Sequence, residues 1–129
     1  MQFSQIKETC LYTTDLNAAR DFYADVLELP LIHDYEGRHL FFRIGTSVLL
    51  IFNPEATRLE DNLPPHFASG KQHIAFECQT DDYQAWKDRL IAAGIIITHE
   101  QDWPGGRLSF YFEDPAGNVL EVIQPGVWE

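Results

Sequence analysis

The same order of predicted elements occurs twice along this chain of 129 residues. In each copy a strand is followed by an amphipathic helix and then by three short strands. The first copy covers about residues 5–53 and the second about residues 71–125, and a turn-rich connector, residues 54–70, joins them. One copy cannot cover both faces of a four-stranded sheet, so the two copies must pack together. We therefore expect a single domain over residues 1–129.

Changes in hydrophobic period mark the elements of the first copy. β-Forming residues fill positions 5–14, and residues 15–29 then carry a helical apolar stripe, with Asp15 as the N-cap and Pro30 as the stop. The alternation and the intervening turn residues predict three strands, over residues 30–35, 38–44 and 47–52.

The second copy repeats this order after Gly70. A strand is predicted over residues 72–78 and a helix over 80–94, with Thr80 as the N-cap and Gly94 just past the end. Three more strands are predicted, over residues 95–100, 107–113 and 118–123. The expected fold is α+β, with two βαβββ modules that form a curved eight-stranded sheet around a central cavity and place their helices outside.

Alternation within each strand separates a helix-facing side from a cavity-facing side. The helix side takes the apolar sets Leu40, Phe42 and Ile44, and Leu108, Phe110 and Phe112. The cavity side of the same strands takes His39, Phe41 and Arg43, and Arg107, Ser109 and Tyr111.

Superposition of the two copies gives four equivalent cavity positions. Glu8 falls opposite His73, and the matched prolines that follow the last strands place Leu50 opposite Glu121. Two carboxylates and an imidazole that converge on one point are unfavourable unless a cation lies between them. A divalent metal would satisfy all three, and three protein ligands would leave positions for water or substrate. Without a metal, Glu8 and Glu121 would instead be solvated at a cavity mouth or hydrogen-bonded to Arg43 or Arg107.

Other residues on the cavity side are candidates for substrate binding. Arg43 and Arg107 are suited to an anionic group, and Tyr111 to hydrogen-bond donation. The apolar part of a substrate would contact a wall of Phe41, Leu50, Phe52 and Trp103, and His66 in the connector would lie over the site as a lid residue.

Three stretches resemble the vicinal oxygen chelate superfamily, which includes glyoxalase, bleomycin-resistance, fosfomycin-resistance and extradiol-dioxygenase proteins. They are "ETCLYTTDLNAARDFYADVLELPL", "GKQHIAFEC" and "FYFEDPAGNVLEVIQP", of which the last is the most specific. The similarity spans roughly residues 5–125.

In the metal-dependent members of this superfamily, the first, fourth, fifth and eighth strands supply ligands, and the resemblance places these at Glu8, Leu50, His73 and Glu121. Leu50 cannot coordinate a metal, and Glu8 replaces the more usual histidine. The site therefore resembles the three-ligand pattern of the fosfomycin-resistance and dioxygenase branches. Glyoxalase activity, which goes with four ligands in the enzymes resembled, is not favoured.

The donor set and the resemblance together predict a metal-dependent enzyme that acts on a small oxygen-chelating substrate, as a lyase, isomerase, transferase or dioxygenase. Two carboxylates favour hard ions, so Mn²⁺ or Fe²⁺ is expected before Zn²⁺ or Ni²⁺. The resemblance also implies that Glu8 or Glu121 could leave the metal and act as a general base. The alternative is a metal-free protein of the bleomycin-resistance type, which binds and sequesters a drug.

Charge and composition restrict the partners and the compartment. Nine Lys and Arg against 20 Asp and Glu give a net charge of −11, which does not suit nucleic acid or an anionic membrane. Cys10 and Cys78 form no spacing motif, and the chain carries neither a secretory signal nor a membrane-spanning stretch, so a soluble cytoplasmic protein is expected. A homodimer is expected from the resemblance, and the site could lie within one chain or be shared between two.

Overall fold

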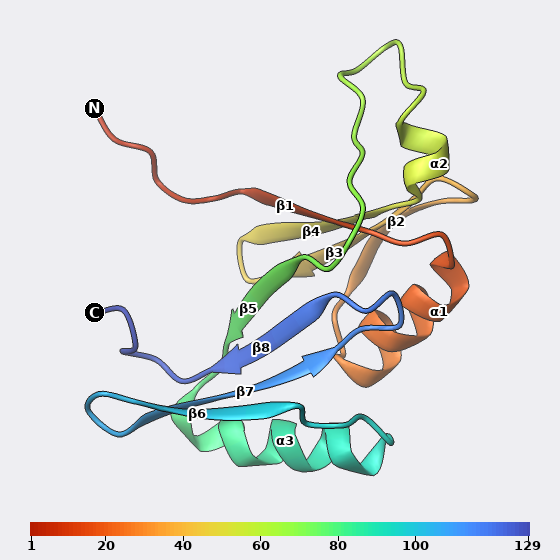
Figure 1. Cartoon of the computed structure of the whole chain (residues 1–129). Helices are drawn as coiled ribbons and strands as arrows, with labels where there is room; N and C mark the ends of the chain where they lie inside the picture. The colour runs from red at the N-terminus through yellow and green to blue at the C-terminus, as the bar shows by residue number, and fades with distance from the viewer. The chain divides into compact units, whose positions relative to one another are not determined.

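The computed structural model describes residues 1–129 and divides into two compact units, Met1–Gly70 and Lys71–Glu129 (Figure 1). Each unit carries one copy of the repeat, and the α+β class with two βαβββ modules is confirmed. No helix in the structure has the length and apolar character needed to cross a bilayer.

The first unit contains a four-stranded sheet with the order β1-β4-β3-β2, in which β1 and β4 are parallel and the other neighbours antiparallel. Asp15 is the N-cap, as predicted: its Oδ1 accepts a hydrogen bond of 3.0 Å from the Ala18 amide. The elements of this unit are β1 (Glu8–Tyr12), α1 (Leu16–Arg20), the π-helix η1 (Asp21–Val26), β2 (Leu31–Tyr35), β3 (His39–Ile44), β4 (Ser47–Phe52) and α2 (Pro54–Thr57).

Two features of the first unit differ from the expectation. The single helix predicted over residues 15–29 changes at Asp21 to the wider π form, which ends at Val26. The connector holds a short helix, α2, where only a turn-rich segment was predicted. Asn53 caps this helix through its side-chain oxygen, and Pro54 occupies the first helical position, where a missing amide proton is harmless.

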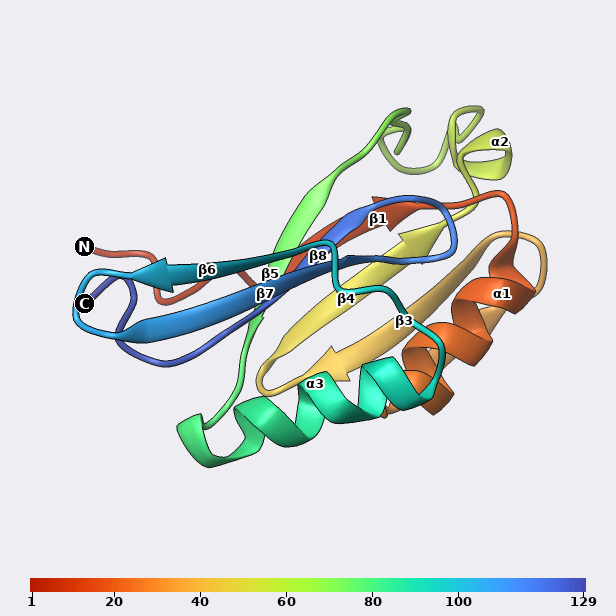
Figure 2. The same cartoon turned by 60° about the horizontal axis from the view of Figure 1, so that its bottom comes forward.

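The second unit repeats the arrangement with the order β5-β8-β7-β6, and β5 and β8 form its parallel pair. The helix α3 lies along one face of this sheet (Figure 2), and the Tyr83 ring centroid is 5.2 Å from that of Phe110 on β7. The elements are β5 (His73–Glu77), the 3-10 turn η2 (Thr80–Asp82), α3 (Tyr83–Ala92), β6 (His99–Trp103), β7 (Arg107–Glu113) and β8 (Val119–Ile123).

Two predicted boundaries in the second unit are wrong. Thr80 is not an N-cap: it opens the 3-10 turn, and the α-helix begins only at Tyr83. The strand predicted over residues 95–100 is observed at His99–Trp103. The reason is the helix end, where Gly94 adopts φ +82° and the Ile95 amide donates to the Leu90 carbonyl at 2.9 Å. This bond belongs to the end of α3, so the apolar residues after Gly94 lie outside the sheet, and Ile96 is 77% exposed.

The helix-facing sides of the two sheets form the core. Leu40, Phe42, Phe110 and Phe112 are all fully buried, as the alternation predicted. The other two predicted residues are less buried: Ile44 is half-buried and Leu108 is 38% exposed, because each lies beside a turn at one end of its strand.

Candidate functional site

The four predicted ligand positions form two equivalent pairs in the two sheets, as the strand register shows. Glu8 and His73 are each the first residue of the strand that pairs in parallel with the last strand of its sheet. Leu50 and Glu121 each lie opposite the residue two positions further along that strand. The two sheets therefore present matching positions, of which only Leu50 lacks a donor atom.

His73 and Glu121 form the polar centre of the second sheet. His73 Nε2 lies 3.4 Å from Glu121 Oε1, and His73 Nδ1 lies 2.9 Å from the carbonyl oxygen of Val119. A carbonyl can only accept a hydrogen bond, so Nδ1 carries the proton and donates it to Val119. In the neutral imidazole, Nε2 then presents its lone pair toward the Glu121 carboxylate.

Glu121 is deeply buried for an ionisable residue. Its side chain is 5% exposed, and its Oε2 atom is buried without a hydrogen-bond partner. A buried carboxylate oxygen without a partner is costly, and a lone pair opposite the other oxygen adds repulsion. A divalent cation bound by both side chains would remove both penalties. The bond from Nδ1 to a backbone carbonyl is also the support that metal-binding histidines commonly have.

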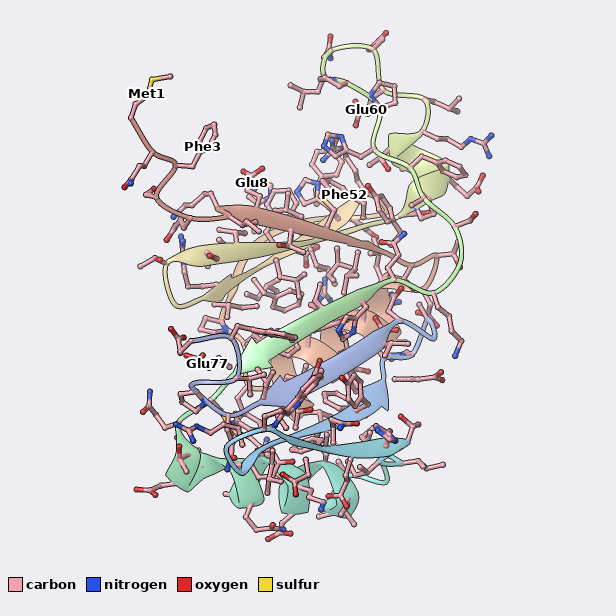
Figure 3. The ribbon with its side chains drawn as sticks, turned by 60° about the vertical axis from the view of Figure 1, so that its left-hand side comes forward. Met1, Phe3, Glu8, Phe52, Glu60 and Glu77 are labelled. Carbon is pink, nitrogen blue, oxygen red and sulfur yellow. The ribbon has the colours of Figure 1, made fainter.

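Neither unit contains by itself a group of three or more His, Cys, Asp or Glu side chains that could hold a metal. Within the second unit, His73 and Glu121 are two neighbouring side chains with donor atoms that a metal could use. Glu8 is an exposed carboxylate at the equivalent position of the first unit, and it forms no ion pair there (Figure 3). Its assignment as the third ligand stays a prediction.

Tyr111 lies on β7 directly across from Glu121. Its ring centroid is 5.9 Å from that of His73. Burial raises the pKa of the Tyr111 phenol, and hydrogen bonding to Glu121 and the charge of that carboxylate raise it further, while a hydrogen bond from Ser109 lowers it. The phenol is therefore a protonated donor beside the Glu121 carboxylate. The Trp103 indole N–H donates to Ser109 Oγ at 2.9 Å, so Trp103 also contacts this polar group.

Arg107 and Trp103 also contact the end of the second unit. The Arg107 guanidinium donates to the Gly105 carbonyl at 2.9 Å and to the Pro125 carbonyl at 3.1 Å. The Trp103 ring lies 5.4 Å from the Trp128 ring, centroid to centroid. The roles predicted for both side chains in substrate binding remain predictions.

Three residues of the predicted apolar wall, Phe41, Leu50 and Phe52, lie on one face of the first sheet, whereas Trp103 belongs to the second sheet. Leu50 is the antiparallel neighbour of Phe41, and the Phe41 and Phe52 rings meet edge-on at 5.7 Å. His66 reaches this face from the connector, with its ring 5.0 Å from Phe52. Figure 3 labels Phe52 and Glu8 in this unit. The half-buried Arg43 follows Phe41 by two residues on β3 and forms no ion pair.

A hydrogen-bonded chain on the same sheet was missed at the sequence level. His33 and His39 carry no functional signal in the sequence beyond their strand positions, and Arg38 and Glu60 belong to no motif. His33 Nδ1 lies 2.7 Å from His39 Nε2, the Arg38 guanidinium donates to His39 Nδ1, and Arg38 Nε lies 2.6 Å from Glu60 Oε1. Glu60 comes from the connector, and no local pattern joins it to β3.

His39 is neutral in this chain of contacts. The pKa of His39 is lowered to about 4, chiefly by burial and also by the positive charge of Arg38 and by His33, while Asp34 and Glu60 act in the opposite direction. Since Arg38 donates to Nδ1, the His39 proton sits on Nε2 and points to His33. The imidazole therefore behaves as an uncharged aromatic ring near pH 7.

Comparison with known proteins identifies the family. The family model described as Glyoxalase/Bleomycin resistance protein/Dioxygenase superfamily matches residues 5–122. The chain belongs to this superfamily. The resemblance noted in the sequence is thereby confirmed.

Individual relatives span several activities. The crystal structure of lactoylglutathione lyase from Agrobacterium tumefaciens superposes with a TM-score of 0.94 at 37% identity, covering 99% of this chain and 98% of that chain. Metallothiol transferase FosB of Staphylococcus epidermidis is 29% identical, over 95% of this chain and 82% of that protein. Biphenyl-2,3-diol 1,2-dioxygenase 2 of Rhodococcus globerulus is 32% identical over 87% of this chain, which spans 58% of that dioxygenase.

Proposed function

We propose that the protein is a metal-dependent enzyme that binds a small substrate through the oxygen atoms of that substrate. Glu8, His73 and Glu121 are the proposed ligands. The observation that carries this proposal is the pair formed by His73 and Glu121, in which an imidazole lone pair faces a buried carboxylate with a partnerless oxygen. Such a pair is stabilised by a shared cation.

The names of the relatives support an enzyme. A lyase, a metallothiol transferase and a dioxygenase all align with most of this chain. S-Lactoylglutathione and biphenyl-2,3-diol, the compounds in two of these names, are therefore the first substrates to assay. We expect Mn²⁺ or Fe²⁺ ahead of Zn²⁺ or Ni²⁺, because two of the three proposed ligands are carboxylates.

A bound divalent ion would act as a Lewis acid on a substrate oxygen and stabilise negative charge as it develops. The residues of the chain have separate tasks around it. Val119 fixes the tautomer and the direction of His73. Tyr111, whose pKa is raised, keeps its proton and lies opposite Glu121 on the neighbouring strand. Glu8, which is exposed, is the carboxylate best placed to accept a proton from a substrate.

Metal analysis of the native chain beside Glu121→Gln tests the proposal. The native protein should retain about one ion per chain after loading with Mn²⁺, Fe²⁺, Zn²⁺ or Ni²⁺. Glu121→Gln should lose it, because an amide oxygen is a weaker ligand than a carboxylate. Glu77→Gln, an exposed change of the same charge on β5, is the matched control and should keep the metal. Native protein that binds none of the four ions would contradict the proposal and favour the metal-free sequestering function.

A mixing experiment decides whether one chain or two build the site. Glu8→Gln and His73→Ala each remove one proposed ligand. If the ligands come from two chains, mixed dimers of these variants contain one intact site, and metal binding returns on mixing. If each site lies within one chain, the mixture does not bind the metal.

A further inference from the structure

We propose that one face of the first sheet binds a flat aromatic ring that carries a negatively charged group. This aromatic face is the side of the sheet opposite α1, with Phe41 near its middle and Arg43 beside it. Its rings are those of Tyr12, His33, Tyr35, His39, Phe41, Phe52 and His66. Such a ligand would be the substrate of the proposed metal-dependent enzyme. Binding of the ligand does not depend on that function, but its chemical conversion does.

One row of rings crosses all four strands of the sheet. Tyr35 pairs with His39, His39 with Phe52, and Phe52 with Tyr12. The ring centroids are 5.7 Å apart for the first pair, 5.9 Å for the second and 6.2 Å for the third. These spacings are those of aromatic rings in contact, so the row is continuous.

Phe41 forms the second row and lies next to the first. Its ring is stacked on His39 with centroids 4.0 Å apart and planes inclined by 9°, and it lies 5.7 Å from His33. Phe41 is only half-buried, unlike Phe52 and His39. The two rows therefore form an aromatic surface that is closed at His39 and Phe52 and open to a ligand ring at Tyr12, Tyr35 and Phe41.

The charges around this face favour a ligand with a negative group. Arg38 is paired with Glu60, and His39 is neutral, so neither of them is expected to bind the negative group of the ligand. Arg43 has no ion pair and lies on the same side of β3 as Phe41. Glu8, the acidic residue in the register row of Arg43, is the proposed metal ligand, which leaves the guanidinium for the ligand.

The second sheet has the same fold with fewer of these rings. By register, Tyr111 keeps an aromatic ring at the position of Phe41, but Ser109 takes the position of His39 and Ile123 that of Phe52. The βαβββ module therefore forms without the row of rings that runs through His39 and Phe52. The proposed ligand accounts for the presence of that row in the first copy only.

Binding of benzoate and cyclohexanecarboxylate tests the inference. The two acids have the same charge and nearly the same size, but only benzoate has an aromatic ring. Full-length, metal-free protein is titrated with each acid while the Phe41, His39 and Phe52 side-chain resonances are followed by NMR. We expect benzoate to shift these resonances and to bind roughly three- to tenfold more tightly than its saturated counterpart.

Variants connect that difference to the face. Phe41→Leu should weaken benzoate binding by roughly the same factor and leave cyclohexanecarboxylate binding unchanged, and Phe41→Tyr, which keeps the ring, should bind benzoate like the native protein. Arg43→Gln should weaken both acids equally. Phe3→Leu, in the exposed N-terminal segment, is the control and should change nothing (Figure 3).

Equal binding of the two acids, or benzoate binding that survives in Phe41→Leu, would overturn the inference. Metal binding is measured separately, so the two proposals can be refuted independently. Protein that binds benzoate but no metal would refute the metal-dependent enzyme and support the aromatic binding face. Protein that binds metal but does not distinguish the two acids would support the enzyme and refute the aromatic binding face.

Discussion

Leu50 and Glu121 occupy the same place in the two sheets, yet only Glu121 can bind a metal. Each is the cross-strand neighbour of an aromatic residue, Phe41 for Leu50 and Tyr111 for Glu121. Both are buried, with Leu50 6% and Glu121 4% exposed. The two positions are therefore equivalent in the strand pairing but differ in their chemistry. The position of Leu50 can be tested directly by substitution.

Leu50→Glu should create a fourth ligand if the four positions converge as predicted. An added donor worth about 1.4 kcal/mol would tighten metal binding roughly tenfold. Competition with a chelator of known affinity measures the change. Leu50→Gln has nearly the same size without the charge and should give little gain. Unchanged or weaker binding in Leu50→Glu would mean that Leu50 does not face the metal.

Stability should fall in acid because of His39. The pKa of this imidazole is lowered from 6.5 to about 4, chiefly by burial. Between these values the unfolded chain takes up a proton that the folded chain does not, so stability rises with pH. The contribution is complete above about pH 6.5 and decreases toward pH 4, by roughly 3 kcal/mol in total.

Urea unfolding at pH 7 and at pH 4.5 measures this loss. His39→Gln should lose about 2 kcal/mol less than the native protein over that interval, because glutamine does not titrate. His99→Gln changes an exposed histidine on β6 and should retain the native pH dependence. Identical pH dependence in His39→Gln and the native protein would refute the role of His39.

Phe110→Ala should be strongly destabilising. Phe110 is fully buried and lies between Tyr83 on α3 and Phe112 on its own strand, at centroid distances of 5.2 Å and 5.9 Å. Loss of the ring leaves a cavity where α3 meets the sheet, and the expected loss is about 3–5 kcal/mol of unfolding free energy. Phe67→Ala, at a half-exposed position in the connector, should change stability by less than about 1 kcal/mol.

Asp114→Ala should open the turn between β7 and β8. Asp114 Oδ1 accepts from the Ala116 amide at 2.9 Å and from the Asn118 amide at 2.8 Å, and Oδ2 accepts from the Asn118 side chain at 2.9 Å. Alanine would leave these donors unsatisfied at a buried position, for a loss of about 2–3 kcal/mol. Asp114→Asn keeps one acceptor oxygen and should lose less. Equal thermal denaturation midpoints for Asp114→Ala and the native protein would contradict this account.

The sequence was sufficient for those parts of the fold that depend on local periodicity. Alternation identified the buried faces of β3 and β7, and the polar side chain before an apolar stripe identified Asp15 as a cap. Thr80 fits the same pattern, but it is not an N-cap, because the chain forms a 3-10 turn before α3 begins. The cap rule does not distinguish these two helix starts, since both place a small polar residue before acidic or apolar residues.

The site was predictable only as far as the repeat extends. Superposition of the copies identified His73 and Glu121, and their contact follows from the parallel pairing of β5 with β8. The link from Glu60 through Arg38 to His39 had no sequence signal, because it joins a connector residue to a strand by a contact that no period encodes. The tautomer of His73 likewise depends on a backbone carbonyl, which every residue has.

The π-helix η1 means that the two modules are not interchangeable. In this element the consecutive residues Phe22 and Tyr23 are both buried, with ring centroids 5.1 Å apart, and Tyr23 lies 5.7 Å from Phe42. The regular helix α3 buries Tyr83 and Leu90 and has no two adjacent aromatic residues. Grafting the α3 sequence into the first module would therefore strip one aromatic anchor from its core, however well the strands matched.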